Sequence, residues 1–218
     1  MKYRYMEHNT GYELNKSLRL WRPQFPVILS LVKKDSKVLD IGCGDGVLGK
    51  MLIEDKNCLV YGIDLDKLGV KEAKRKGLKA QVLDADEPLP FKNKEFDIAI
   101  NSEVLQFTKN PDFIIAETLR VAKSAIVAFP NFGFWFYRLQ TLFGKFPGLS
   151  LYGHSWYQTR QTKFFSLSDF LSLPAMKNVQ IKKLVCIDWK NRKISLLAKF
   201  FPNFFGRSCI LLLQKANR

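Results

Sequence analysis

Short apolar segments alternate with amphipathic segments through the first 130 residues, and this alternation constrains the fold more than any other feature. Strands are expected over 37–42, 58–63, 79–83, 96–100 and 125–129. Helices are expected over 45–56, 67–76 and 112–122, where apolar residues recur every three or four positions. Because strands joined through helices run parallel, the pattern predicts a doubly wound, mainly parallel α/β sheet.

The two ends of the chain depart from this pattern. Residues 12–34 are expected to be helical, with Pro23 and Pro26 dividing the run in two. Two more strands are expected over 179–187 and 209–214, without a convincing long helix between them. They predict an antiparallel final pair at one sheet edge, which brings the sheet to seven strands.

Charge divides the chain into three regions. The net charge of +15 comprises +5 over residues 1–37, −2 over 38–110 and +12 over 111–218, and 14 of the 18 phenylalanines follow position 110. A basic, aromatic second half favours an anionic partner such as a nucleic acid, a membrane surface or an acidic molecule. A well-solvated basic surface explains the charge equally well.

One domain is expected over the whole chain, because no repeat or low-complexity linker interrupts it. Its expected parts are a helical cap over 1–36, a cofactor-binding half over 37–129, and an acceptor or partner half over 130–218. No apolar stretch approaches the roughly 18 residues of a membrane helix, and the first residues lack the apolar stretch of a signal peptide. Four scattered cysteines without a CxxC pair predict no zinc site and no disulfide framework, and a reduced, cytoplasmic compartment is expected.

The segment 38–46 carries the clearest chemical signal. An expected strand runs into a turn with three glycines, Gly42, Gly44 and Gly46, which let a ligand lie against bare backbone. A nicotinamide-binding G-x-G-x-x-G would place its third glycine at position 47, which is Val. Asp40 precedes the glycines, and its carboxylate would repel a pyrophosphate but stabilise the cationic amino group of a methionine moiety.

Polar side chains also end the next three strands. Asp64 follows the glycines by about 20 residues, where a carboxylate can accept both hydroxyls of a ribose. Asp84 ends the third strand, where it could hold an adenine amino group, and Asn101 and Ser102 end the fourth. A single strand-terminal Asp is often only a helix cap or turn residue, but this ordered series favours an adenosyl ligand. The expected cofactor-binding residues are Asp40, Gly42, Cys43, Gly44, Gly46, Asp64, Leu65, Asp84, Ala85 and Asn101.

From about Lys37 to Phe129 the chain resembles the class I S-adenosylmethionine-dependent methyltransferases. The matching stretches are Val38–Gly46, the acid of Tyr61-Gly-Ile-Asp64, and Leu83–Phe91 followed by Glu95-Phe-Asp97. The resemblance implies S-adenosylmethionine as cofactor, S-adenosylhomocysteine as product, and a Rossmann-like sheet of seven strands with an antiparallel last strand. That topology agrees with the one that the pattern of apolar residues predicts independently.

Over roughly residues 22 to 187 the chain resembles the MetW family, which is associated with methionine biosynthesis. The similar stretches are Arg22-Pro23, Ser102–Gln106, Phe129-Pro-Asn-Phe-Gly-Phe-Trp135, Arg138-Leu-Gln140 and Trp156-Tyr157. The chain departs from the family at Phe134 and Lys163, where His is usual, and at Gln158, where Asp is usual. These positions fall in the expected acceptor region, so the family's acceptor or partner does not simply carry over.

Three functions remain open at this point. The first is a methyltransferase acting on a small, anionic acceptor, and the second, implied by the resemblance, is a cofactor-binding partner of a homoserine acyltransferase without turnover of its own. The third is an RNA methyltransferase, which only the basic charge favours. A hydroxyl or carbon acceptor would need a base, for which His154 and Tyr157 are the candidates. A structural role is favoured for His154, and Tyr157 fits a pocket wall or the core equally well.

Two aromatic segments of the second half have alternative interpretations. Phe132–Phe146 is expected to form a helix over the mouth of the crevice, either as an acceptor lid or as a core helix. Lys199–Phe205 is expected to be either a hydrophobic loop over the sheet edge or a surface patch for a partner.

Overall fold

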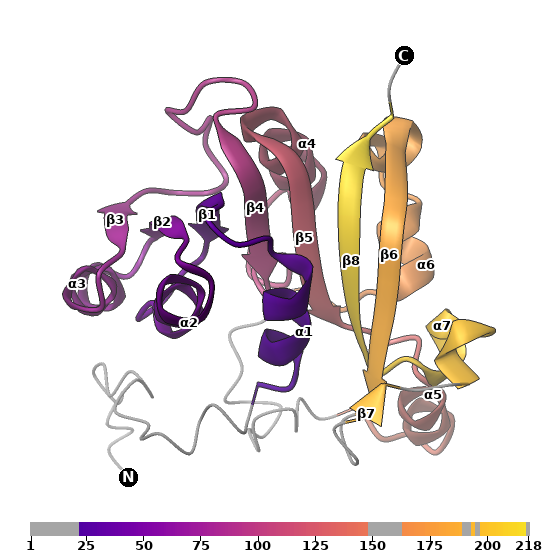
Figure 1. The fold of residues 1–218 in the computed structure, drawn as a ribbon. Helices are drawn as coiled ribbons and strands as arrows, with labels where there is room; N and C mark the ends of the chain where they lie inside the picture. The colour runs from indigo at the N-terminus through magenta and orange to yellow at the C-terminus, as the bar shows by residue number, and fades with distance from the viewer. Residues whose placement is uncertain (1–21, 148–162, 189–192, 195–196, 217–218) are drawn as a thin grey trace, which may run out of the picture.

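The structure, a computed structural model, describes residues 22–147, 163–188, 193–194 and 197–216 (Figure 1). The strands of this part form one sheet in the order β3-β2-β1-β4-β5-β8-β6-β7. Five of them run parallel: β1 (Lys37–Ile41), β2 (Leu59–Asp64), β3 (Lys79–Val82), β4 (Phe96–Ser102) and β5 (Ala122–Pro130). The other three are β6 (Val179–Asp188), β7 (Lys193–Ile194) and β8 (Ser208–Lys215).

The predicted α/β sheet with an antiparallel last strand is confirmed. β8 lies between β5 and β6 and pairs antiparallel with both. The sequence did not predict β7, whose two residues pair with the end of β6. A strand this short carries no alternation of apolar and polar residues that could reveal it.

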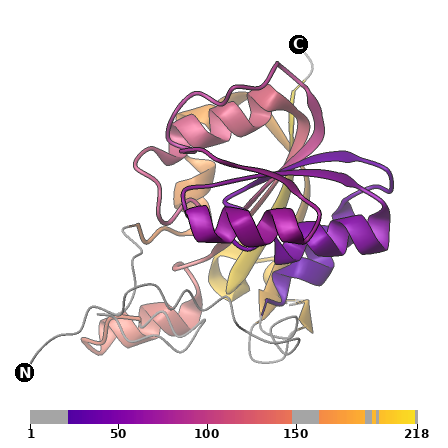
Figure 2. The same ribbon diagram turned by 90° about the vertical axis from the view of Figure 1, so that its left-hand side faces the viewer.

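Helices cover both faces of the sheet (Figure 2). One face packs against α1 (Gln24–Leu31), α2 (Val47–Lys56) and α3 (Lys67–Arg75), and the other packs against α4 (Pro111–Val121) and α6 (Leu167–Leu171). Because both faces are buried, the central strands are apolar along most of their length, and the last six residues of β5 are all buried.

The helix before β1 corrects one prediction, because Pro26 does not interrupt it. Pro23 is the N-cap of α1, and Pro26 lies in its first turn. The first four N–H groups of a helix have no partner within the helix, so a proline is tolerated there. Of the predicted helix over 12–34, residues 12–21 lie outside the described residues.

The helix after β5 is shorter than predicted, and the other helical elements of this part are also short. The expected helix over 132–146 is α5 (Trp135–Leu142), which ends before Gly144, a glycine with a φ of +71°. A capping box between Ser166 and Asp169 starts α6, and α7 (Pro202–Phe205) falls within the expected aromatic loop. The 3-10 turns η2 (Pro174–Asn178) and η3 (Leu197–Lys199) complete this part. None of the described helices is long and apolar enough to cross a membrane.

Candidate functional site

The glycine turn after β1 has the backbone geometry that its sequence requires. Gly42, Gly44 and Gly46 all have positive φ values, of 70°, 54° and 77°. A Cβ at Gly42 would lie 2.2 Å from Cγ2 of Val104, so only glycine fits between β1 and the segment after β4. The turn is anchored to β2, because the N–H groups of Gly42 and Cys43 both donate to the carbonyl oxygen of Ile63, at 2.8 and 3.0 Å.

Asp64 joins the end of β2 to this turn. Its Oδ2 accepts a hydrogen bond from the N–H of Gly44 at 2.7 Å, and its Oδ1 accepts one from the N–H of Asp66 at 2.9 Å. Each carboxylate oxygen can accept more than one hydrogen bond, so both retain acceptor capacity. The predicted ribose-binding carboxylate is therefore held rigidly beside the glycines.

Asp40 lies inside the protein, one residue before the end of β1. Its side chain is only 2% exposed, and burial together with the negative charge of Asp64 raises its pKa to about 7, which the positive charge of Arg22 opposes. A buried carboxyl without a full counter-charge favours the approach of a cation. This geometry suits the sequence-based interpretation that Asp40 faces a cationic ligand group.

Glu103 and its partners form a part of the site that the sequence did not reveal. The residue follows β4 with a φ of +60°, and its Oε1 accepts a hydrogen bond from Nε2 of the buried Gln24 at 3.0 Å. Burial raises the pKa of Glu103 to about 7, against the opposing charge of Arg22. The positive charge of Arg22 thus acts on both Asp40 and Glu103, and Gln24, the first residue of α1, contacts the residue that follows β4.

The sequence contained part of the evidence for the cluster of Arg22, Gln24 and Glu103. Arg22 and Glu103 fall in two of the stretches that resemble the MetW family, but the sequence assigned neither a role. Their convergence depends on a contact between Gln24 and Glu103, which lie 79 positions apart. An unusual backbone conformation at a half-buried acid beside a glycine turn is typical of functional sites.

The remaining predicted residues occupy different surroundings. Asp84 lies two residues beyond β3, and its Oδ1 accepts from the N–H of Asp86 at 2.9 Å, as in an Asx turn. Leu65 is exposed, and the half-buried Ala85 packs against two core clusters. Cys43 is buried, and burial with the charges of Asp40 and Asp64 raises the pKa of its thiol, which suits a packing role.

Asn101 differs from the other predicted residues in its hydrogen bonding. It is fully buried near the end of β4, and within the described part of the chain neither Oδ1 nor Nδ2 has a hydrogen-bond partner. It pairs in register with Ile41, so its side chain lies on the sheet face opposite to that of Asp40. Buried amides are almost always hydrogen-bonded, so this one has the character of a group that awaits a ligand.

The predicted base candidates cannot be placed. His154 and Tyr157 lie outside the described residues, together with Trp156 and Gln158. Within the described residues, the carboxyls with raised pKa values at this end of the sheet are those of Asp40 and Glu103.

Comparison with known proteins assigns the family. The family model for the methionine biosynthesis protein MetW matches residues 22–213. The chain belongs to the MetW family. The match extends the stretch of resemblance seen in the sequence from residue 187 into β8.

Curated relatives and solved structures agree with this assignment. The bifunctional methionine biosynthesis protein MetXA/MetW of Rhodopirellula baltica is 28% identical over 205 residues, 88% of this chain and 32% of that protein. A ubiquinone biosynthesis O-methyltransferase of Pelagibacter ubique is 25% identical over 189 residues, 78% of this chain and 76% of that protein. This MetW-family chain therefore spans about a third of the fused relative and about three quarters of the second.

The solved structures define the fold class. The magnesium protoporphyrin IX methyltransferase of Synechocystis, with bound S-adenosylhomocysteine, superposes with a TM-score of 0.64 at 20% identity, covering 94% of this chain and 89% of that one. The MetW-family chain thus has the fold of the class I S-adenosylmethionine-dependent methyltransferases. The glycine turn, the buried Asp40 and the unpartnered amide of Asn101 fit such a cofactor.

The stretch most specific to the MetW family has a structural task. Asn131 in Phe129–Trp135 is fully buried and makes four hydrogen bonds. Its Oδ1 accepts from the N–H groups of Gly133 and Leu167, and its Nδ2 donates to the carbonyl oxygens of Asn203 and Gly206. One side chain thus ties the segments that carry α5, α6 and α7 together.

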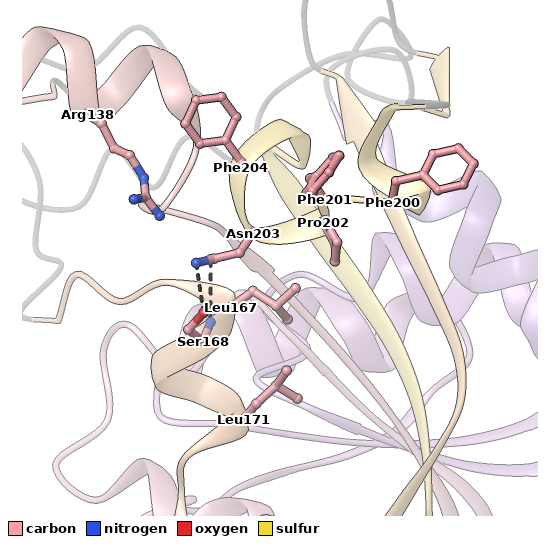
Figure 3. Close-up of a pocket in the computed structure, with 9 residues that line it drawn as sticks. All are labelled: Arg138, Leu167, Ser168, Leu171, Phe200, Phe201, Pro202, Asn203 and Phe204. Carbon is pink, nitrogen blue, oxygen red and sulfur yellow. Dashed lines mark hydrogen bonds between the residues drawn. The ribbon is translucent and has the colours of Figure 1, made fainter.

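A groove of about 330 Å³ lies between α6 and α7 (Figure 3), and its lining includes no residue of the glycine turn. It is lined by Arg138, Leu167, Ser168, Leu171, Phe200, Phe201, Pro202, Asn203 and Phe204. The side chain of Asn203 bridges the two helices, since its Nδ2 donates to Oγ of Ser168 at 2.8 Å. The groove is predominantly apolar and is separate from the candidate cofactor site.

Proposed function

We propose that this MetW-family protein binds S-adenosylmethionine at the carboxyl ends of β1, β2 and β4 and transfers its methyl group to a small anionic acceptor. The observation that carries the proposal is the buried Asp40 beside a turn of three positive-φ glycines. A methionine moiety offers the ammonium group that such a carboxyl stabilises. A nicotinamide dinucleotide would bring a pyrophosphate to the same place, which the carboxyl repels.

Each part of the cofactor has a matching residue in this proposal. Asp40 holds the ammonium group, Asp64 accepts the ribose hydroxyls, and the Asp84–Ala85 turn flanks the adenine. Arg22 supplies a positive charge for the ligand's carboxylate between Asp40 and Glu103. The buried amide of Asn101 gains the hydrogen bonds that it lacks within the described structure.

Bound S-adenosylmethionine supplies a methyl group on a sulfonium that already carries its own leaving group. The protein then has to hold the acceptor in line with that methyl group and exclude water. The basic second half raises the local concentration of an anionic acceptor. For a hydroxyl acceptor, Glu103 is suited to take the proton, because a pKa of about 7 leaves it able to exchange a proton at neutral pH. His154 and Tyr157 stay predictions for the same task.

A pair of matched substitutions tests the cofactor site. We expect Asp64→Ala to weaken the binding of S-adenosylmethionine about tenfold or more, because it removes charge-assisted hydrogen bonds. Asp97→Ala is the control: that carboxylate accepts from the N–H of Lys37 and from Nζ of Lys123 at the opposite ends of β1 and β4. Isothermal titration calorimetry of both variants distinguishes a ligand contact from a general loss of stability. Unchanged affinity in Asp64→Ala would overturn the ribose assignment.

A second function is favoured by one comparison. In the Rhodopirellula baltica relative, MetXA and MetW segments form a single protein. This favours a role in which the chain binds the cofactor and acts by associating with a homoserine acyltransferase. Size-exclusion chromatography of the two purified proteins tests it: co-elution without formation of S-adenosylhomocysteine supports the partner role. Separate elution together with turnover in the presence of a small acceptor supports the enzyme.

An RNA acceptor rests on the basic charge alone. Phosphate contacts make nucleic-acid binding fall steeply with salt, so the affinity for RNA at low and high ionic strength tests this function. An affinity for RNA that is weak and does not change with salt would rule out this function.

A further inference from the structure

Two segments of the second half present large apolar side chains to solvent, and we call them together the aromatic face: residues 135–146, with α5, and residues 197–207, with η3 and α7. Leu142, Phe143 and Phe200 are 78%, 73% and 79% exposed. The exposed apolar residues of the face are Trp135, Phe136, Leu139, Leu142, Phe143, Phe146, Leu197, Phe200, Phe201 and Phe204. Such concentrated apolar exposure marks an interaction surface.

The aromatic face is also basic. Its two segments contain Arg138, Lys145, Lys199 and Arg207 and no Asp or Glu. On the adjoining α6, Asp169 is engaged in the capping box, where the N–H and hydroxyl of Ser166 lower the pKa of its carboxyl. By contrast, residues 38–110 have a net charge of −2. The aromatic face therefore suits a partner that is both apolar and anionic.

The framework beneath the face is firmly fixed. The four hydrogen bonds of Asn131 and the contact between Asn203 and Ser168 hold α5, α6 and α7 in place. In Figure 3, Arg138 stands at one end of the groove beside Phe204, and its guanidinium carbon lies 5.7 Å from the centroid of that ring. Phe205 packs against the core, whereas Phe200, Phe201 and Phe204 are exposed.

We propose that the aromatic face docks the protein onto anionic lipid bilayers. Its aromatic side chains enter the interfacial region, the groove receives the end of an acyl chain, and Lys145 and Lys199 contact headgroup phosphates. Lysine next to exposed aromatic residues is typical of protein surfaces that bind membranes, whereas the cores of protein–protein interfaces are depleted of lysine. This role is independent of the proposed methyl transfer.

Vesicle sedimentation tests the proposal with the full-length protein. We expect it to sediment with vesicles of phosphatidylcholine mixed with phosphatidylglycerol, and much less with vesicles of phosphatidylcholine alone. Raising the salt concentration should weaken binding, because the headgroup attraction is screened. Equal binding to both vesicle types, or to neither, would overturn the proposal.

Matched variants locate the surface. Replacing Phe200 and Phe201 together by Ser should lower the affinity for anionic vesicles about tenfold or more, since each side chain loses its burial in the interface. Lys145→Glu with Lys199→Glu should abolish the preference for anionic lipid. The control replaces Leu59 and Leu68, two exposed apolar residues on β2 and α3, by Ser and should leave vesicle binding unchanged.

Two further readouts separate membrane docking from misfolding and from a macromolecular partner. The variants should keep the thermal unfolding midpoint and the affinity for S-adenosylmethionine of the parent protein, which separates this proposal from the cofactor site. Vesicle binding that survives in the Phe200/Phe201 variant would contradict the assignment. The proposal would also be contradicted if the protein did not bind vesicles but instead self-associated or bound RNA, and if the Phe200/Phe201 variant abolished that interaction.

Discussion

Two buried asparagines, at the ends of adjacent strands, show how differently the two halves of the molecule use polar groups. Asn101 on β4 and Asn131 just after β5 are both fully buried. Asn131 makes four hydrogen bonds to segments that carry α5, α6 and α7, whereas the amide of Asn101 has none within the described part of the chain. We therefore expect the amide of Asn101 to bind a ligand, whereas Asn131 holds the segments around α5, α6 and α7 in place.

The carboxyl groups extend this contrast. In the first half, burial raises the pKa values of the buried Asp40 and the half-buried Glu103 to about 7. In the second half, Asp169 is engaged by Ser166 in a helix cap, and its pKa is lowered. We expect the two carboxyls with raised pKa values to act on a ligand, whereas the capped Asp169 stabilises the start of α6.

The largest effect is expected from Asn131→Ala. The change leaves two N–H groups and two carbonyl oxygens without their partner, so the free energy of unfolding should fall by about 4 kcal/mol. Urea denaturation measures it. The control is Asn93→Ala, whose exposed side chain accepts from Arg120 at the surface and should cost less than about 0.5 kcal/mol. Similar losses in both variants would contradict the structural role of Asn131.

A second test compares two glycines of the same backbone conformation. Gly42 and Gly144 have φ values of +70° and +71°, but a Cβ would meet Val104 at 2.2 Å only at Gly42 and nothing within 4 Å at Gly144. Gly144→Ala should cost about 1 kcal/mol of stability for backbone strain alone. Gly42→Ala should cost about 3 kcal/mol, because a steric clash adds to that strain, and should also abolish cofactor binding. Equal losses of stability in the two variants would mean that Gly42 is not closely packed against Val104.

The effect of Asn101→Leu on the free energy of unfolding should be opposite in sign to that of Asn131→Ala. Removing a buried, unpartnered amide in favour of an apolar side chain of similar size should raise the stability of the ligand-free protein by about 1 kcal/mol. The same change should weaken cofactor binding, which calorimetry measures. A loss of stability comparable to that of Asn131→Ala would show that Asn101 is a structural residue as well.

The last prediction concerns how the free energy of unfolding depends on pH. Unfolded Asp and Glu ionise near 3.8 and 4.5, but Asp40 and Glu103 ionise near 7 in the folded protein. Between these values the folded chain binds more protons, so the free energy of unfolding should fall as pH rises through this window. Asp40→Asn removes the penalty and should stabilise the protein at pH 8 more than at pH 5, by at least about 1 kcal/mol. Denaturation at both pH values checks this, and an equal effect at both would refute it.

The sequence predicted the first half well because its signals are local. Apolar runs mark β1 to β5, and the polar residues at strand ends follow directly from where those runs stop. Asp40 and Asp64 lie beside the glycine turn as predicted, and Asp84 lies two residues past the end of β3 because that strand is shorter than expected. The expectation that Pro26 breaks a helix was wrong, because the first turn does not need its N–H.

In the second half the strands β6 and β8 were predicted, but the short helices α6 and α7 and the side-chain contacts were not, because their determinants are distant in sequence. Asn131 bonds to residues 36, 72 and 75 positions away, and no local pattern reveals such contacts. The Gln24–Glu103 contact has the same character. The start of α6 was not predicted either, although Ser166-x-x-Asp169 has the spacing of a capping box.

Hydrogen–deuterium exchange with and without S-adenosylmethionine tests most directly whether the two halves have separate tasks. Exchange should slow in the peptides that contain residues 42–46, 64–66 and 101–104, which line the candidate cofactor site. It should stay unchanged over residues 197–207, which carry the outer part of the aromatic face. Protection over residues 197–207, or no protection over residues 42–46, would contradict the claim that the first half alone binds the cofactor.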